Sequence, residues 1–142
     1  MDVVNKLQRE RIMITRITIK SESAYGPIEK SYKDRLTITR SSVRYEYEPL
    51  KPTNRNQPQK WTATNPSAQF GSMFRNLCEE VQNIFDSVPY EYASGDHDIT
   101  TFTIMYDNGE KEERRFSLPD ETFTVCFTIV DQMVKSANRQ LM

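Results

Sequence analysis

The chain has 142 residues, of which 37% are hydrophobic and 27% are charged, and its 19 basic and 20 acidic residues leave a net charge of −1. This length favours a single folded domain, and the even charge balance lacks the positive field that sequence-independent nucleic-acid binding requires. No apolar run reaches the roughly 18 residues of a membrane span and the N-terminus has no signal-peptide core, so we expect no membrane association and a cytoplasmic location.

The N-terminal part of the chain predicts a tail followed by a strand. The first dozen residues are mostly polar and have no clear period, so we expect a flexible appendage over residues 1–12 and a single domain over 13–142. In an extended strand Met13, Ile17 and Ile19 would point to one face, whereas Ile12 and Ile14 would point to the other. This pattern indicates either a bulge or a strand covered on both faces. A turn at Tyr25-Gly26-Pro27 follows.

Two further alternating segments precede a proline-rich loop. Residues 36–39 and 43–48 alternate apolar or aromatic side chains with polar ones, and the alternation slips at Ser41-Ser42. Two short strands and one long bulged strand both fit this pattern. Residues 49–60 contain three prolines and almost nothing to bury, which predicts a solvated loop ending at Trp61.

Two helices are predicted from apolar spacing. Asn65-Pro66 is typical of a helix N-cap followed by proline at the first helical position, and apolar residues then recur at helical spacing from Phe70 to Val88. The segment after Thr122 is rich in β-prone residues. However, Phe123 to Ala137 follows the helical period without an interrupting glycine or proline, so we predict a second helix that frays after Asn138.

Between the helices, residues 99–118 predict a hairpin around Asp107-Asn108-Gly109. A two-residue Asn-Gly loop would mix apolar and charged side chains on one face. A three-residue loop with Gly109 in the left-handed region pairs Phe102 with Arg114 and gathers the apolar residues on one side, so we prefer this register.

The predicted order is two or three strands, a helix, a hairpin and a second helix. This order predicts an α+β fold, with an antiparallel sheet of four to five strands and two helices packed on one face. The other face would meet solvent or a partner.

The chain shows no cluster of catalytic or metal-binding residues, and we expect no cofactor. Cys78 and Cys126 lack a second thiol or histidine at ligand spacing and lie on or beside apolar helical stripes, so we interpret both as core residues. His97 lies between Asp96 and Asp98, which suggests either a solvated loop or, as an enzymatic alternative, a general base in an uncharacterised hydrolase or transferase. The four isolated glycines form no phosphate-binding loop.

Tyrosine is the unusual component, with seven in the chain and two similar triplets, Tyr45-Glu46-Tyr47 and Tyr90-Glu91-Tyr92. Because tyrosine offers a large amphipathic surface at low entropic cost, we predict that Tyr45, Tyr47, Tyr90 and Tyr92 contact a partner. The first triplet also fits a strand with tyrosines toward the core and glutamates toward water. The second triplet follows Pro89 in a loop and is the better candidate.

Charge is unevenly distributed along the chain. The first 44 residues are positive, whereas residues 79–98 are acidic. This asymmetry suits an acidic partner or an RNA backbone, although folding often produces a balanced surface. Nucleic-acid contact through the basic N-terminal third is therefore a second alternative, which the overall charge disfavours.

Several short motifs follow one another along the chain: Ile17-Thr18-Ile19-Lys20-Ser21, Tyr25-Gly26, Leu36-Thr37-Ile38, Trp61 before a helix, and Asp98 before Phe102-Thr103-Ile104. This layout resembles a group of small α+β proteins and is similar to the emfourin-type protein inhibitors of metalloproteases. The resemblance spans most of residues 13–137 and implies an inhibitor or binding module without a cofactor. The chain departs from this group in lacking a twin-glycine turn and in having the loop at 49–60, so no functional residue is carried over.

The leading hypothesis is a small non-enzymatic module that binds another protein as an inhibitor. Its motivation is the missing catalytic set, the compact size and the tyrosine-bearing segments. The target could be a protease or a defence nuclease, as for a phage-encoded anti-defence protein. The sequence leaves the partner and the oligomeric state open.

Overall fold

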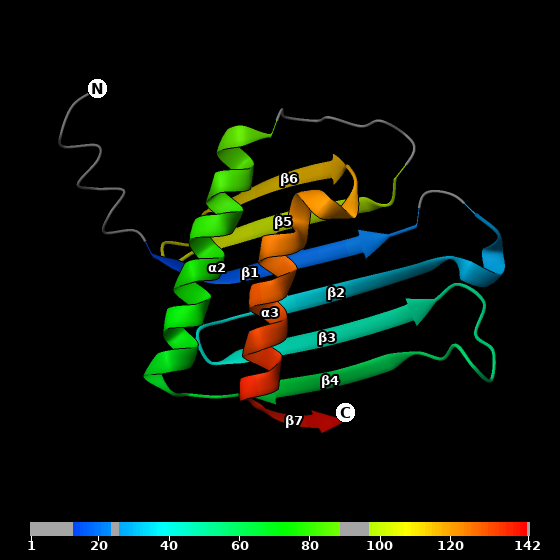
Figure 1. The fold of residues 1–142 in the computed structure, drawn as a ribbon, viewed down its shortest axis with the longest axis horizontal. Coiled ribbons are helices and arrows are strands. Elements are labelled where there is room, and N and C mark those ends of the chain that lie inside the picture. The colour runs from blue at the N-terminus through cyan, green and yellow to red at the C-terminus, as the bar shows by residue number, and fades with distance from the viewer. Residues whose placement is uncertain (1–12, 24–25, 89–96, 142) are drawn as a thin grey trace.

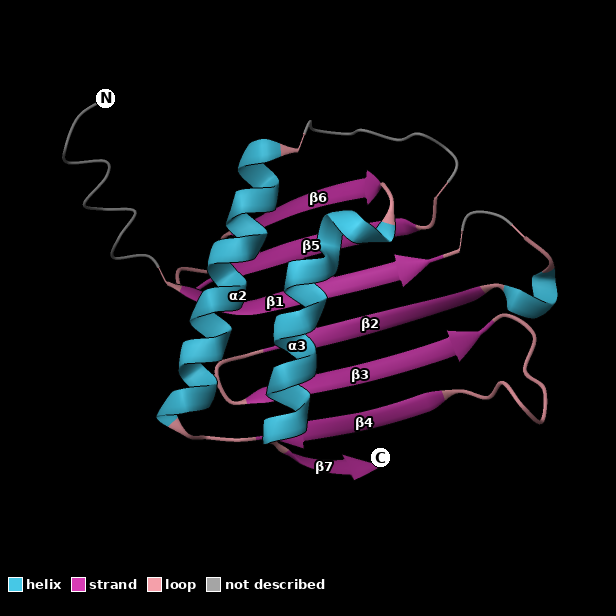
Figure 2. Ribbon diagram, viewed as in Figure 1, coloured by secondary structure: helices cyan, strands magenta, loops and turns pink. Residues whose placement is uncertain are grey.

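The computed structural model describes residues 13–23, 26–88 and 97–141, which form one antiparallel sheet and two α-helices (Figure 1, Figure 2). The strands are β1 (Ile14–Glu22), β2 (Tyr32–Ile38), β3 (Ser42–Pro49), β4 (Gln59–Thr64), β5 (Ile99–Tyr106), β6 (Lys111–Ser117) and β7 (Asn138–Leu141). The helices are α2 (Ala68–Ser87) and α3 (Thr124–Ser136), with 3-10 turns η1 (Ile28–Lys30) and η2 (Asp120–Phe123).

The α+β class is confirmed, but the predicted four to five strands are too few. The sheet order is β6-β5-β1-β2-β3-β4-β7, with six strands of six to nine residues and the four-residue β7 at one edge. The two unpredicted strands, β4 and β7, pair with each other.

The predicted loop over 49–60 is wrong at both ends, because Pro49 belongs to β3 and Gln59 begins β4. Trp61 and Ala63 alternate along β4 and are both buried, so this strand contributes to the core despite its polar neighbours. The predicted fraying after Asn138 is also wrong. Backbone pairing with β4 holds this segment at the edge of the sheet.

The predicted hairpin register is confirmed. Phe102 lies opposite Arg114, and Gly109 has a φ of 89°, a conformation that costs glycine little. The two alternatives left open by the earlier segments are also resolved: β1 has a bulge between Ile14 and Arg16, and β2 and β3 are separate strands.

Both predicted helices form, but the predicted cap of the first is wrong. Ser67 caps α2, since its hydroxyl accepts a hydrogen bond from the Phe70 backbone N–H at 3.2 Å. Asn65 instead accepts from the Ser67 N–H at 3.0 Å and donates its amide to the Ser136 carbonyl at 3.0 Å. Asn65 therefore links the start of α2 to the end of α3.

Figure 1 shows α2 and α3 lying in front of the same face of the sheet. The core lies between these layers, and at one end the rings of Phe102, Phe116 and Phe123 have centroids 5.3–6.1 Å apart. Neither helix in the described ranges combines the length and apolarity needed to cross a bilayer. The predicted appendage over residues 1–12 lies outside the described residues.

Candidate functional site

Tyr45 and Tyr47 lie on the part of β3 that the helices leave uncovered. In Figure 1 the right-hand ends of β2, β3 and β4 extend past α3. Val43 is buried, whereas Tyr45 and Tyr47 further along the same face are half-buried. Glu46 alternates to the opposite face of the sheet. Half-burial suits tyrosine, because its ring can pack while its hydroxyl and one edge stay accessible.

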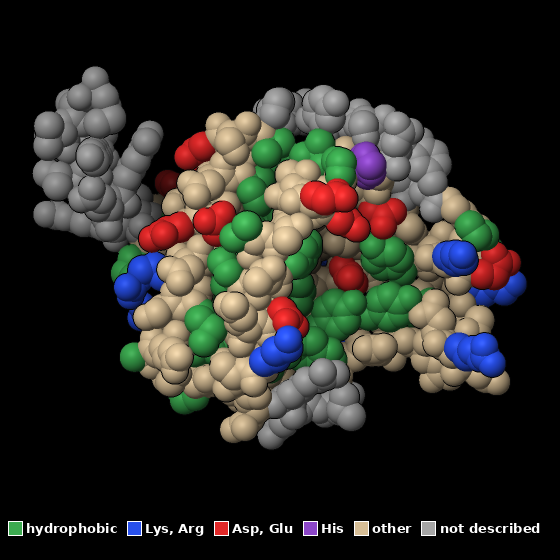
Figure 3. All heavy atoms as spheres, in the orientation of Figure 1, with side chains coloured by type: hydrophobic (Ala, Val, Ile, Leu, Met, Phe, Trp, Pro, Cys, Tyr) green, Lys and Arg blue, Asp and Glu red, His purple; other side chains and the backbone are tan. Residues whose placement is uncertain are grey.

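Beside Tyr45 and Tyr47, a hollow of about 530 Å³ opens between α3 and the neighbouring strands β1, β2 and β5. Figure 3 shows hydrophobic or aromatic side chains and carboxylates meeting in a recess to the right of α3. The lining residues are Ile19, Ser21, Tyr32, Asp34, Leu36, Asp98, Thr100, Asp120, Thr124, Phe127, Thr128 and Asp131. We call these residues, together with the adjoining Tyr45 and Tyr47, the tyrosine hollow.

Hydrogen bonds and ring contacts hold its aromatic wall in place. The Tyr32 hydroxyl donates to Asp98 Oδ2 and the Tyr45 hydroxyl donates to Asp34 Oδ2, each at 3.0 Å. The Tyr32 and Tyr47 rings stack with centroids 5.9 Å apart and planes 24° apart. The Tyr45 ring lies 5.4 Å from that of Trp61. The three tyrosines are therefore fixed before any partner binds.

Burial and a neighbouring carboxylate keep Tyr32 and Tyr45 neutral. Burial, followed by the charge and hydrogen bond of the adjacent aspartate, raises the pKa of both Tyr32 and Tyr45 above the ordinary 10.0. A tyrosine that acts as a nucleophile or base needs a lowered pKa instead. The hollow is therefore chemically suited to contact and hydrogen bonding.

Asp34 gives a pH-dependent prediction. Burial raises the pKa of its carboxyl above 3.8, although hydrogen bonds from Tyr45 and Ser21 oppose the shift. Folding therefore favours the protonated carboxyl. The stability that the wild type gains in this way is fully present below pH 3.8 and is lost as the pH rises through the raised folded pKa. The unfolding free energy of Asp34→Asn relative to wild type should therefore increase with pH from 3.8 upward in urea titrations. A relative decrease would contradict the burial of this carboxylate.

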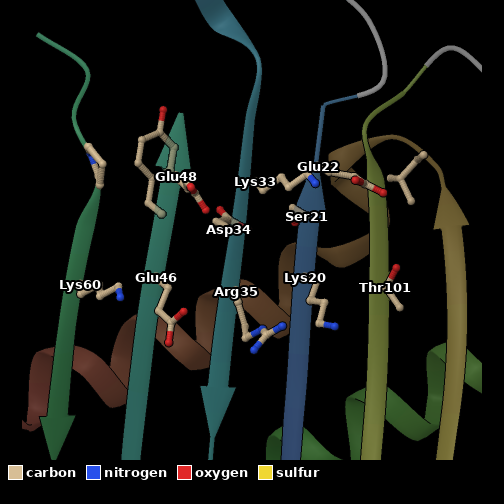
Figure 4. A pocket seen from close by; sticks show the side chains of 13 residues that line it. Lys20, Ser21, Glu22, Lys33, Asp34, Arg35, Glu46, Glu48, Lys60 and Thr101 are labelled. Atoms are coloured by element: carbon tan, nitrogen blue, oxygen red, sulfur yellow. The ribbon is translucent and has the colours of Figure 1, made fainter. Parts of the chain in front are cut away.

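Neither of the described helices, α2 or α3, covers the opposite face of the sheet. Figure 4 shows this face with the helices behind the strands, and a row of labelled side chains, Lys60, Glu46, Arg35, Lys20 and Thr101, crosses neighbouring strands. We call the side chains of β1 to β6 on this side the outer face. Its basic members are Arg16, Lys20, Lys33, Arg35, Arg44, Lys60, Lys111 and Arg115, and its acidic members are Glu22, Glu46, Glu48 and Glu113.

Of the second tyrosine triplet and the segment around His97, the structure describes only His97 and Asp98. Tyr90, Tyr92 and Asp96 lie outside the described residues. His97 does not line the tyrosine hollow, and the neighbouring Asp98 carboxylate accepts the Tyr32 hydrogen bond. Within the described ranges no three His, Cys, Asp or Glu side chains gather where they could hold a metal ion.

Cys78 and Cys126 are core residues, as predicted. Both thiols are free and buried, with exposed fractions of 8% and 1%. Burial raises the pKa of each thiol to about 12. Neither is present as a reactive thiolate near neutral pH.

Comparison with protein-family models, curated proteins and solved structures finds no match. The resemblance to emfourin-type inhibitors therefore depends on the short sequence motifs alone.

Proposed function

We propose that this protein is a non-enzymatic module that binds another protein through the tyrosine hollow. The observation that carries the proposal is a concave surface, left uncovered by the described helices, that Tyr32 lines and that the half-buried Tyr45 and Tyr47 adjoin, all three already fixed by neighbours. Tyrosines of this kind dominate many interfaces, since they bury much area at a small entropic cost. Preorganisation lowers the cost of association further.

The charge of the hollow supports a partner that presents arginine or lysine. Its lining includes Asp34, Asp98, Asp120 and Asp131, and none of the described lining residues is basic. Lys135 approaches only at the rim, where it pairs with Asp131 at 2.8 Å. Carboxylates beside aromatic rings attract a cationic side chain both by charge-assisted hydrogen bonds and by cation–π contact.

We also propose that binding inhibits the partner protein. A module that only binds alters its partner by covering a surface, and the motifs similar to emfourin-type inhibitors suggest the same outcome. The activity of the captured partner, measured with and without added protein, tests this part separately.

Capture from the native lysate tests the binding proposal. We expect Tyr32→Ala/Tyr47→Ala to reduce recovery of the partner at least tenfold, whereas Tyr106→Ala, at the other end of the sheet, should retain it. Fluorescence of Trp61 confirms that each variant is folded. Equal capture by the hollow variant and the control would remove the tyrosine hollow from the interface. Tyr90→Ala/Tyr92→Ala, assayed in parallel, tests the predicted contact by the second triplet.

A further inference from the structure

The centre of the outer face contains an arrangement that lowers stability. Lys20 on β1 lies directly opposite Arg35 on β2. Like charges in such cross-strand positions repel each other. Glu46 is the neighbour of Arg35 on β3, but its carboxylate is bonded to Arg44 at 3.0 Å. Within the described residues, neither Lys20 nor Arg35 forms an ion pair.

A carboxylate at either position would remove this repulsion without disturbing the core, because both side chains are exposed. Sequences usually agree with local structural rules, and departures from those rules concentrate where function requires them. The Lys20–Arg35 pair therefore indicates a functional constraint on this face.

Positive charge is in excess over the whole outer face. It carries eight basic and four acidic side chains, a net charge of +4 within a chain whose net charge is −1. Two of the cations are neutralised locally, Arg44 by Glu46 and Arg115 by Glu22 at 3.7 Å. Salt at physiological concentration screens charges over about 8 Å. A partner on the outer face therefore responds to the charges of that face more than to the aspartates of the tyrosine hollow on the opposite face.

Two recesses of about 610 and 570 Å³ lie side by side on this face and share Lys20 and Arg35. The first is lined by four basic and four acidic residues, whereas the second is lined by four basic residues and one acidic residue and is the one suited to an acidic segment. The second recess is lined by Arg16, Thr18, Lys20, Arg35, Thr37, Thr103, Met105, Lys111 and Glu113. Short threonine side chains between the longer cations leave room for a chain to lie across the strands. Their hydroxyls can also donate to carboxylates.

We propose that the outer face is a second docking surface and that it binds an acidic segment of a partner protein. A protein is favoured over nucleic acid for two reasons. Glu22, Glu46, Glu48 and Glu113 are interspersed among the cations and would repel a continuous phosphate backbone. In addition, Tyr47 is the only described aromatic residue that lines either recess, and its side chain belongs to the opposite face of the sheet, where its ring stacks on that of Tyr32. This proposal does not depend on the tyrosine hollow.

The test measures binding of the full chain to a fluorescently labelled peptide of alternating glutamate and serine by fluorescence anisotropy at 100 mM salt. This probe can place neutral residues opposite the glutamates of the outer face, which a polyanion charged at every unit cannot. We expect Lys20→Glu/Arg35→Glu to raise the Kd at least tenfold, and Lys20→Gln/Arg35→Gln to raise it less. The control Lys30→Glu/Arg75→Glu makes the same change of charge away from the outer face and should shift the Kd less than twofold. The single change Lys20→Glu should also raise the midpoint of urea unfolding, which separates loss of binding from loss of structure.

Three results would overturn the proposal. The first is the absence of binding specific to this face, seen either as no binding by wild type or as equal weakening in the outer-face variant and the control. The second is tighter binding of a 20-nucleotide oligothymidylate than of the glutamate–serine peptide, if this binding is lost in Lys20→Glu/Arg35→Glu, because the occupant would then be a nucleic acid. The third is concentration-dependent self-association in sedimentation that the same variant abolishes, because the occupant would then be a second copy of the chain.

Discussion

Phe102→Ala is expected to lower the unfolding free energy by about 3–5 kcal/mol, the range typical of a buried phenylalanine replaced by alanine. Phe102 is 0% exposed, and its ring centroid lies 5.3 Å from that of Phe123 and 6.1 Å from that of Phe116. Its removal would leave a cavity where the β5–β6 hairpin meets the start of α3. Since domains of this size have only about 5–15 kcal/mol of stability, the variant should be close to unfolding at ambient temperature.

Urea unfolding followed by Trp61 fluorescence measures this loss. Val125→Ala is the matched control, because Val125 lies on α3 but is 55% exposed, and it should change stability by less than about 0.5 kcal/mol. A loss below 1 kcal/mol in Phe102→Ala would show that the aromatic cluster is not the packing centre of the domain.

Trp61→Ala should cost a similar amount, about 3–5 kcal/mol, and should also impair the tyrosine hollow. The indole is 8% exposed, and its ring supports Tyr45 at a centroid distance of 5.4 Å. Without it Tyr45 loses the surface that holds its ring, and its hydrogen bond to Asp34 should weaken. Stability and partner capture should therefore fall together in this variant.

Trp61→Phe is the control that separates the two effects. It retains an aromatic ring beside Tyr45, so we expect a smaller loss of stability and retained capture. Because both variants lack the only tryptophan of the chain, their unfolding is followed by circular dichroism. Full capture by a folded Trp61→Ala protein would contradict a role for indole packing in shaping the hollow.

The elements with strong local patterns were predictable from the sequence. The hairpin register followed from two requirements, apolar residues on one face and a glycine at 109 that tolerates positive φ. The helix α3 was predicted against its β propensity because its apolar period continues through Met133 and Val134.

The elements that were missed depend on distant partners. β7 is a polar four-residue segment, and only β4, far away in the sequence, determines that it is a strand. For β4 the alternation of Trp61 and Ala63 was a readable signal, but the prolines before it suggested that the loop continued. The helix cap was misplaced because Asn65-Pro66 is a plausible start, whereas Ser67 forms the actual cap.

The candidate site was only partly predictable for the same reason. Tyr45 and Tyr47 stood out by residue type. Tyr32, Asp34 and Asp98 were missed, because strand pairing and the β1–β5 contact bring Asp34 to Tyr45, and Tyr32 to Tyr47 and Asp98. The basic residues of the N-terminal third were noticed as a charge excess. These residues lie on one face of the sheet because of the register of β1 against β2, which the sequence pattern did not determine.

Site-specific photocrosslinking tests the binding role of the tyrosine hollow most directly. A benzophenone amino acid is placed at Tyr47 or, as the control, at the exposed Val125 on α3, and each protein is irradiated in the native lysate. We predict a crosslinked partner from position 47 and none from position 125. Crosslinks of equal yield from both positions, or none from position 47 while the partner is still captured, would contradict the proposed interface.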